Sequence, residues 1–408
     1  MTARVASDRL RDTVARLATI GATARGGVTR LALTDEDKAA RDLLARWMQD
    51  IGLDVAVDDV GNMYGRRMGE DPAAAPVAFG SHLDTVIRGG RFDGALGVAA
   101  ALEAMRTLAE TGQRTKRSLV LVNWTNEEGV RFSPAMLGSG VVAGRFDRGY
   151  ADKRQAPEGR TFGEELERIG YRGNASERLR RVAAYVELHI EQGPVLEELG
   201  VDIGVVEGIQ GISWSTCRIE GQAGHAGTTP MARRRDALAA AAELVLAASQ
   251  LPTRVGGELV STVGRLRVSP NAINIIPECV EFSLDLRAPR EDTLTRARTL
   301  FAQHLTNVRS RGYHAAWEEF WVSEPTVFAP AVVAAIERTA RAQGLRTHRM
   351  RSGAGHDAKH AADLGPAGMI FVPCRGGRSH AEDEDVPWET AVAGAQVLLD
   401  VVVTLAAQ

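Results

Sequence analysis

Two short segments of the chain gather side chains that can bind a metal ion. They read SHLDTVIRGGRFDGALG and NWTNEEGVRF, and they contribute one imidazole and four carboxylates: His82, Asp84, Asp93, Glu127 and Glu128. Imidazole nitrogen and carboxylate oxygen are zinc ligands, and paired divalent ions activate water in many hydrolases. We therefore expect a metal site in which Glu128 reaches an ion while its neighbour Glu127 remains free to act as a base.

Two further histidines have settings that suit the same site. His189 lies in VELHIEQGP and His380 in FVPCRGGRSHAED, each where a strand-like run gives way to a loop. The available ligand set for a dinuclear centre is therefore His82, Asp93, Glu128, His189 and His380. Asp84 lies two residues after His82 on the same predicted strand, so its side chain should share that face and orient the imidazole.

The ligands follow segments that are predicted to be buried strands. Residues 77–80, 118–125 and 182–190 are apolar runs of strand length, and helical patterns at 38–51 and 94–108 alternate with them. This alternation predicts an α/β fold with a mostly parallel sheet and helices on its faces. Such a sheet binds its ligands at the carboxyl ends of its strands, which is where the candidate residues fall.

The pattern changes between about residues 211 and 325. WSTCRIEG, LVSTVGRLRVS and VEFSLDLRA alternate apolar and polar residues, as a sheet with one solvated face would, and helical patterns near 236–249 and 291–308 separate them. This order predicts an inserted α+β domain of the ferredoxin-like kind. The metal-binding domain is then discontinuous, formed by residues 1–210 and 326–408, with 211–325 as the insert.

Composition narrows the class of protein. The chain has 408 residues, 44% of them hydrophobic and 25% charged, with a net charge of −3 and no long basic run. It is long enough for two domains, and neither nucleic acid nor an anionic membrane is favoured as a partner. We expect no segment to reach the ~20 apolar residues of a membrane span. Three widely spaced cysteines without a CxxC motif favour a reducing, cytoplasmic location.

At this point the sequence resembles a known family, the zinc-dependent hydantoinase/carbamoylase amidohydrolases, within the larger superfamily of aminoacylase- and carboxypeptidase-like dinuclear metallohydrolases. The resemblance covers nearly the whole chain. The motifs that carry it are SHLDTV, GRFDGALGV, TNEEGVRF, ELHIEQGPVLE, GIQGISW, GQAGHAGTTPMARRRDAL, PNAINIIP, DLR, SGAGHDA and FVPCRGGRSHAEDEDVPWE.

The resemblance implies a role for each site residue. His82 and His189 would hold one divalent ion and Glu128 and His380 a second, with Asp93 bridging them and Glu127 as general base. Zinc is favoured, with manganese, cobalt and nickel as alternatives. The insert would form a homodimer and lend His225 to the partner's oxyanion. Substrate would be bound by these residues: Gln192 at the ureido group, Arg287 with Asn274 at the carboxylate, and the glycines Gly353 and Gly355 through close backbone approach.

The resemblance also implies the reaction. His189 stands where the general peptidase branches usually have an acidic ligand, which points to the carbamoyl/ureido branch of the superfamily. Within that branch we favour hydrolysis of the carbamoyl C–N bond of N-carbamoyl-L-amino acids to amino acid, CO2 and ammonia. Trp214 in GISW favours this activity over allantoate hydrolysis, which is the alternative together with a β-ureidopropionase-type activity; a dipeptidase or aminoacylase is less favoured. A non-catalytic binder is disfavoured because Glu127 and all five ligands are present. His356 and His360 of GAGHDAKH fit a site loop or a helix start equally well.

Overall fold

The computed structural model describes residues 3–408 and divides them into two compact units. Unit 1 contains the described residues up to Glu207 together with Phe328–Gln408, and unit 2 contains Gly208–Val327. The chain leaves unit 1 along one strand, β6, and returns through a short strand, β14, that pairs with it.

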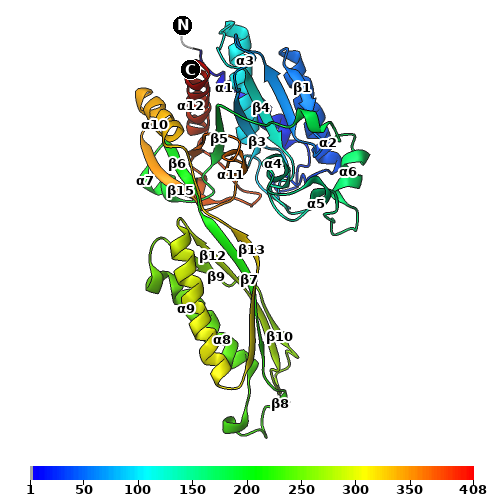
Figure 1. The fold of residues 1–408 in the computed structure, drawn as a ribbon, viewed down its shortest axis with the longest axis vertical. Coiled ribbons are helices and arrows are strands. Elements are labelled where there is room, and N and C mark those ends of the chain that lie inside the picture. Colours follow the sequence, from blue (N-terminus) through cyan, green and yellow to red (C-terminus); the bar gives the residue numbers. More distant parts are fainter. Residues whose placement is uncertain (1–2) are drawn as a thin grey trace. The chain divides into compact units, whose positions relative to one another are not determined.

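Unit 1 is built on a mixed sheet of nine strands (Figure 1). Its strands are β1 (Asp54–Val57), β2 (Met63–Arg67), β3 (Val77–His82), β4 (Leu119–Trp124), β5 (Ala184–Ile190), β6 (Ile203–Ile209), β14 (Thr326–Val327), β15 (Thr347–Ser352) and β16 (Ala367–Val372). Strands β4, β3, β5 and β16 are neighbours and run parallel. The predicted α/β fold with a parallel centre is therefore confirmed, whereas β2 and β6 continue this centre with antiparallel pairing.

Long helices pack on this sheet or on one another, because each carries an apolar face. They are α1 (Ser7–Ala18), α2 (Asp35–Asp50), α3 (Ala95–Thr111), α10 (Pro330–Ala342) and α12 (Trp388–Ala406). Helices α1, α3, α12 and α10 contact one another in that order. Shorter helices lie in the connections: α4 (Leu137–Val142), α5 (Arg148–Asp152), α6 (Phe162–Arg168), α7 (Val195–Leu199) and α11 (Ala358–Ala361).

Helix α12 tests the expectation that no segment of the chain spans a membrane. It is 19 residues long with a mean hydropathy of 1.5, so by length and composition it could span a bilayer. However, 61% of its most apolar window is buried, in contact with α3, α10 and β5. Asp400, which interrupts the apolar run, accepts hydrogen bonds from Gln396 and Gln343. These contacts are those of a core helix.

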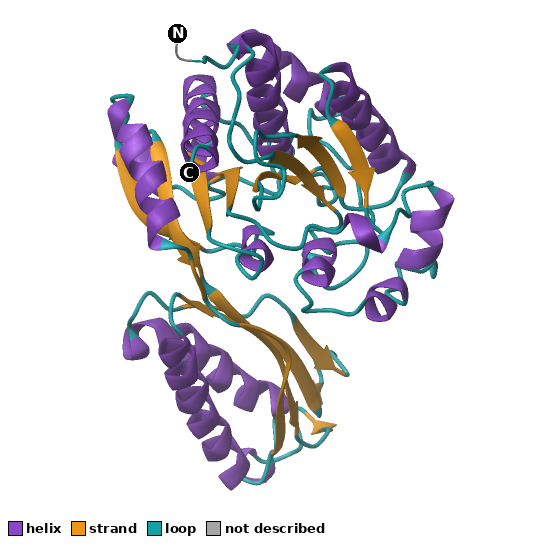
Figure 2. Cartoon of the chain, turned by 45° about the horizontal axis from the view of Figure 1, so that its top comes forward, coloured by secondary structure: helices purple, strands orange, loops and turns teal. Residues whose placement is uncertain are grey.

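Unit 2 is an α+β unit whose sheet is entirely antiparallel (Figure 2). Its elements are β7 (Gly211–Glu220), β8 (Gly224–His225), α8 (Ala237–Val255), β9 (Val260–Thr262), β10 (Leu266–Ser269), β11 (Ile275–Ile276), β12 (Cys279–Ala288), α9 (Glu291–Ser310) and β13 (His314–Ser323). The sheet order is β10-β12-β7-β13, with β9 also paired to β12. Leu244, Phe282 and Phe301 belong to the core between the helices and the sheet.

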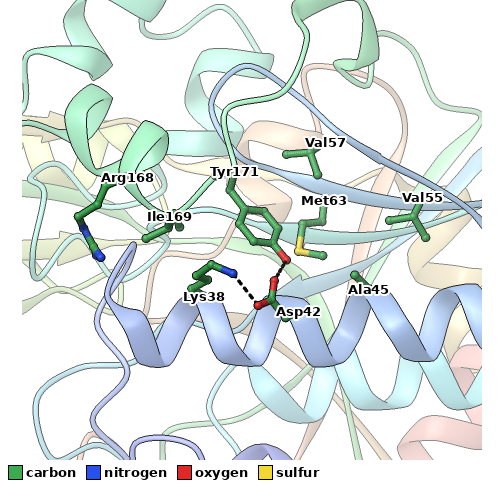
Figure 3. A pocket seen from close by; sticks show the side chains of 10 residues that line it. Lys38, Asp42, Ala45, Val55, Val57, Met63, Arg168, Ile169 and Tyr171 are labelled. Atoms are coloured by element: carbon green, nitrogen blue, oxygen red, sulfur yellow. Dashed lines mark hydrogen bonds and ion pairs between the residues drawn. The ribbon is translucent and has the colours of Figure 1, made fainter.

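A buried arginine links helix α2 to the loop that follows β4. The guanidinium of Arg41 donates to Asp37, to the carbonyl of Gly61 and to Thr125, and both members of the Arg41–Asp37 pair are fully buried. Arg41 also lies against the ring of Tyr171. Tyr171 in turn borders a hollow of about 570 Å³, where its hydroxyl donates to Asp42 (Figure 3).

We predict that Arg41→Ala lowers the free energy of unfolding by about 3–5 kcal/mol, because the substitution leaves Asp37 buried without its cation. Chemical denaturation monitored by circular dichroism measures the change. Arg46→Ala, an exposed position on the same helix, is the matched control and should stay within about 0.5 kcal/mol of wild type. Equal stability of the two variants would contradict a structural role for the buried pair.

Candidate metal centre

Strand ends of unit 1 position the candidate ligands. His82 is the last residue of β3 and His189 the penultimate residue of β5, while Glu127 and Glu128 follow β4 and His380 follows β16. The strands β3, β4, β5 and β16 are parallel neighbours, so their carboxyl ends meet at one edge of the sheet.

Asp93 lies between two sets of ligand atoms. Its Oδ1 is 3.2 Å from His189 Nε2 and 3.7 Å from His82 Nε2. Its Oδ2 is 3.3 Å from His380 Nε2, which is 3.6 Å from Glu128 Oε2. One carboxylate therefore faces a pair of imidazoles with one oxygen and a His–Glu pair with the other.

These separations fit divalent ions. Ligand atoms 2.0–2.2 Å from a tetrahedral zinc ion lie roughly 3.3–3.6 Å apart, and the four contacts of Asp93 and Glu128 above fall close to that range. The ligand atoms of His82, Asp93 and His189, and those of Asp93, Glu128 and His380, lie within 4.8 Å of one another. Glu128 Oε1 is buried and has no hydrogen-bond partner among residues 3–408, so it is free to accept a cation.

Main-chain carbonyls fix two of the imidazoles. Nδ1 of His82 is 2.9 Å from the carbonyl oxygen of Asp84, and Nδ1 of His189 is 2.9 Å from that of Ile190. A carbonyl can only accept, so both Nδ1 atoms carry the proton and each Nε2 is directed at Asp93 as a potential ligand.

The carboxylate of Asp84 has a different role from the one predicted. It lies 3.9 Å from His82 Nδ1 and instead accepts the backbone N–H groups of Glu127 and Glu128, each at 3.2 Å. Strand β3 ends at His82, so the two-residue alternation that placed Asp84 beside the imidazole no longer applies. Asp84 thus holds the loop that presents both glutamates, and its main chain orients His82.

Glu384 is a site residue that the sequence reasoning missed. Its Oε1 accepts the backbone N–H groups of Phe92 and Asp93, and its Oε2 accepts the hydroxyl of Ser379. Ser379 also donates to Asp93 Oδ2, as does the side-chain amide of Gln192 at 2.8 Å. Glu384 lies in the acidic run AEDED, and nothing in the sequence of that run distinguishes the buried residue from its less buried neighbours.

Burial and repulsion between carboxylates dominate the electrostatics. Burial, with the carboxylates of Asp357 and Glu128 nearby, raises the pKa of Glu127 well above its usual value. Burial and Asp93 do the same to the pKa of Glu128. In contrast, hydrogen bonds with His189 and His380 overcome burial and hold the pKa of Asp93 well below its usual value.

His356 and His360, which the sequence left open, are both buried in unit 1. The ring of His356 lies 4.4 Å from that of His189, centroid to centroid, and its Nε2 is 2.9 Å from Ser352 Oγ. Nδ1 of His360 is 3.1 Å from Ser139, whose hydroxyl also contacts Asp357. His356 therefore packs against His189, a candidate ligand, and His360 links α11 to α4 through Ser139.

The substrate-contact candidates are divided between the units. Gly353 and Gly355 lie in unit 1 between β15 and α11; a side chain added at Gly353 would meet open space, and one at Gly355 would meet Met136. His225, Asn274 and Arg287 lie in unit 2. Ala226 N–H donates to Asn274 O, so His225 and Asn274 lie close together.

Arg287 lies at the opposite end of the unit 2 sheet from His225 and Asn274. It pairs with Ile212 near the start of β7, whereas β8 and β11 follow the other end of that strand. Strand β7 has 10 residues, which at ~3.3 Å per residue is roughly 30 Å. One copy of unit 2 therefore cannot place Arg287 and Asn274 on the same small carboxylate.

Comparisons with known proteins show the family to which the chain belongs. A family model described as peptidase family M20/M25/M40 matches residues 78–404. The chain is 42% identical to the N-carbamoyl-L-amino-acid amidohydrolase of Rhizobium meliloti, over 99% of this chain and 97% of that protein. It is 37% identical to the allantoate amidohydrolase of Bacillus subtilis, over 97% of both.

A solved structure is also similar. The hydantoinase/carbamoylase family amidase of Burkholderia multivorans has a TM-score of 0.94 and 43% identity, covering 100% of both chains. The family resemblance inferred from the sequence motifs is confirmed.

A glycine at the start of α3 gives a sharp test of the centre. Gly94 has φ 62°, and a Cβ there would lie 2.4 Å from the imidazole of His82. We predict that Gly94→Ala displaces His82 and lowers bound metal, measured by elemental analysis, while the protein stays folded. Gly112→Ala also introduces a side chain at positive φ (63°, in the left-handed helical region), but nothing lies near its Cβ, so this variant should retain metal. Equal metal content in both variants would contradict the placement of His82 as a ligand.

Proposed function

This chain belongs to peptidase family M20/M25/M40, and we propose that it is a metal-dependent amidohydrolase that cleaves the carbamoyl C–N bond of N-carbamoyl-L-amino acids. The products would be the free amino acid, CO2 and ammonia. The observation that carries the proposal is that two sets of candidate ligands share the carboxylate of Asp93. The chain is also 42% identical to the N-carbamoyl-L-amino-acid amidohydrolase of Rhizobium meliloti.

Two divalent ions per subunit are proposed for this centre, one at His82, His189 and Asp93 and one at Asp93, Glu128 and His380. Zinc suits these nitrogen and oxygen ligands, and manganese, cobalt or nickel could replace it. Bound there, the ions would polarise the ureido carbonyl and lower the pKa of the attacking water.

Glu127 is proposed as the general base and proton shuttle. Its Oε2 lies 3.6 Å from His82 Nε2, so the carboxylate borders the proposed ion position. The raised pKa of Glu127 suits a group that takes a proton from the attacking water and passes it to the departing nitrogen.

The substrate would be held by groups from both units. Gln192 Oε1 is buried without a hydrogen-bond partner among residues 3–408, so it can accept an N–H of the ureido group. The backbone at Gly353 and Gly355 would lie against the substrate. Arg287 would bind the substrate carboxylate, for which a planar guanidinium offers paired donors.

His225 and Asn274 are proposed to come from the second subunit of a homodimer formed by unit 2. Their separation from Arg287 along the sheet supports this, because two copies can supply both ends to one substrate. His225 Nδ1 accepts the N–H groups of Gly227 and Thr228, which leaves Nε2–H as the donor for the oxyanion. We propose a cytoplasmic location for the dimer, because all three cysteines are free.

Allantoate is the principal alternative substrate. Like an N-carbamoyl amino acid, it carries a carboxylate next to ureido groups, and the same contacts could bind it. The 37% identity to the Bacillus subtilis allantoate amidohydrolase supports keeping this alternative. A β-ureidopropionase-type activity would use the same groups on N-carbamoyl-β-alanine, in which the carboxylate lies one methylene group further from the ureido nitrogen.

Ammonia release from a panel of substrates tests the proposed reaction. We expect release from N-carbamoyl-L-amino acids to exceed that from allantoate and N-carbamoyl-β-alanine. Dialysis against a chelator should abolish it, and zinc, manganese or cobalt should restore it. Full activity in metal-free protein, or release from allantoate alone, would refute the proposal.

Paired substitutions separate the base from the ligand. We expect Glu127→Gln to keep the metal content and to lower kcat by about 10²–10⁴, because it removes proton transfer while preserving shape. Glu128→Gln should instead lower the metal content. Elemental analysis and steady-state kinetics measure the two effects, and unchanged turnover in the Glu127 variant would assign the base elsewhere.

Complementation tests the sharing of His225 between subunits. We expect inactive His225→Ala protein mixed with inactive Glu127→Gln protein to recover about one quarter of wild-type activity, since half the dimers would be mixed and each would have one intact site. Subunit exchange is verified by mass spectrometry of tagged chains. Exchange without recovery would show that His225 does not act across the interface.

A further inference from the structure

One face of the unit 2 sheet is left open by its helices. Along β7, Ser213, Ser215 and Cys217 are buried on the side of α8 and α9, whereas the alternate residues Trp214 and Arg218 are exposed. On the neighbouring strand β12, Asp285 pairs with Trp214, and residues directly opposite in an antiparallel pair share a face. Arg287, two residues further along β12, lies on this open face as well.

The open face is divided into an apolar end and a charged end. Trp214 and Phe320 lie at the end near Arg287, 38% and 59% exposed, with their ring centroids 6.5 Å apart. Towards the other end, the same face carries Arg218, Glu281 and Glu318. Exposed aromatic side chains that gather in one place mark a binding surface more often than single exposed residues do.

The cation of Arg287 lies within this apolar end. In the strand register, Arg287 is directly opposite Ile212 on β7 and Val260 on β9. Val260 is 50% exposed. Asp285 accepts hydrogen bonds from the guanidinium at 2.9–3.2 Å, which fixes its plane on the sheet. A planar guanidinium presents paired N–H donors that match the two oxygens of a carboxylate.

A β-bulge orients Phe320 towards Trp214. The register of β13 against β7 shifts between Glu319 and Trp321, so that Trp321 instead of Phe320 pairs with Trp214. Bulges add an unpaired residue and redirect its side chain, and they are common next to binding sites. The aromatic pair therefore depends on a specific irregularity of this strand.

We propose that Trp214 and Phe320 form an apolar shelf that receives the side chain of the substrate when Arg287 binds its carboxylate. The preferred substrates are then N-carbamoyl-L-amino acids with a large apolar or aromatic side chain. This inference rests on the proposed function and adds the substrate class. The carboxylate and the side chain of an α-amino acid are both attached to the α-carbon. A cation next to an aromatic pair can therefore bind the carboxylate while the aromatic rings contact the side chain.

Binding measurements test the shelf independently of turnover. Metal-loaded Glu127→Gln protein is titrated calorimetrically with N-carbamoyl-glycine, N-carbamoyl-L-leucine and N-carbamoyl-L-phenylalanine. We expect N-carbamoyl-L-phenylalanine to bind at least roughly 10-fold more tightly than N-carbamoyl-glycine. Trp214→Ala and Phe320→Ala, each added to that protein, should reduce this ratio roughly 10-fold and change the affinity for glycine little.

Leu246→Ala is the matched control, because Leu246 lies on α8 of the same unit and is 59% exposed, as Phe320 is. It should leave the ratio unchanged. Equal affinities for the three ligands, or a ratio unaffected by both shelf variants, would overturn the inference even if wild type releases ammonia. Conversely, a side-chain-dependent affinity without ammonia release from wild type would support the shelf and refute the proposed reaction.

Discussion

Four carboxylates buried at one edge of the unit 1 sheet repel one another, and the rest of the centre depends on how that repulsion is balanced. Asp84, Asp93, Glu127 and Glu128 are all largely removed from water. Desolvation and neighbouring negative charge both disfavour ionised carboxylates, which is why the pKa values of Glu127 and Glu128 are raised. Divalent cations between these groups would relieve the repulsion, so metal binding and the folding of this edge are expected to be coupled.

The main chain holds this arrangement in place. Carbonyls of Asp84 and Ile190 fix two imidazoles, while the carboxylates of Asp84 and Glu384 each accept a pair of backbone N–H groups. Gly94 leaves room for His82 where any side chain would collide with the ring. Because these contacts use backbone atoms at strand and helix ends, the fold of this edge orients His82, His189 and the loop that carries Glu127 and Glu128.

The candidate substrate contacts of unit 2 lie at two separate places along one sheet. Arg287 and the aromatic pair lie at one end, and His225 with Asn274 lies beyond the other. A strand cannot bend these groups together, because its length is fixed by its residues. The proposed division of substrate contacts between two copies rests on this geometry, and it would make assembly a requirement for activity.

The sequence by itself indicated the types of the candidate ligands and the strands that carry them. Apolar runs at residues 77–80, 118–125 and 182–190 predicted buried strands, and the helical patterns between them predicted the parallel centre. Such patterns are local, since each depends on residues close together in the chain. The motifs also identified the family, because they are long and keep their order.

Tertiary structure alone decided how these residues are placed and which groups they contact. That Asp84 binds the glutamate loop, that Glu384 holds the backbone at Asp93, and that His356 lies behind His189 all depend on contacts between distant segments. The antiparallel edges of the sheet and the burial of α12 were likewise outside local patterns. In unit 2, register separated Arg287 from Asn274 and brought Phe320 to Trp214, and register is a property of paired strands that no single strand's sequence contains.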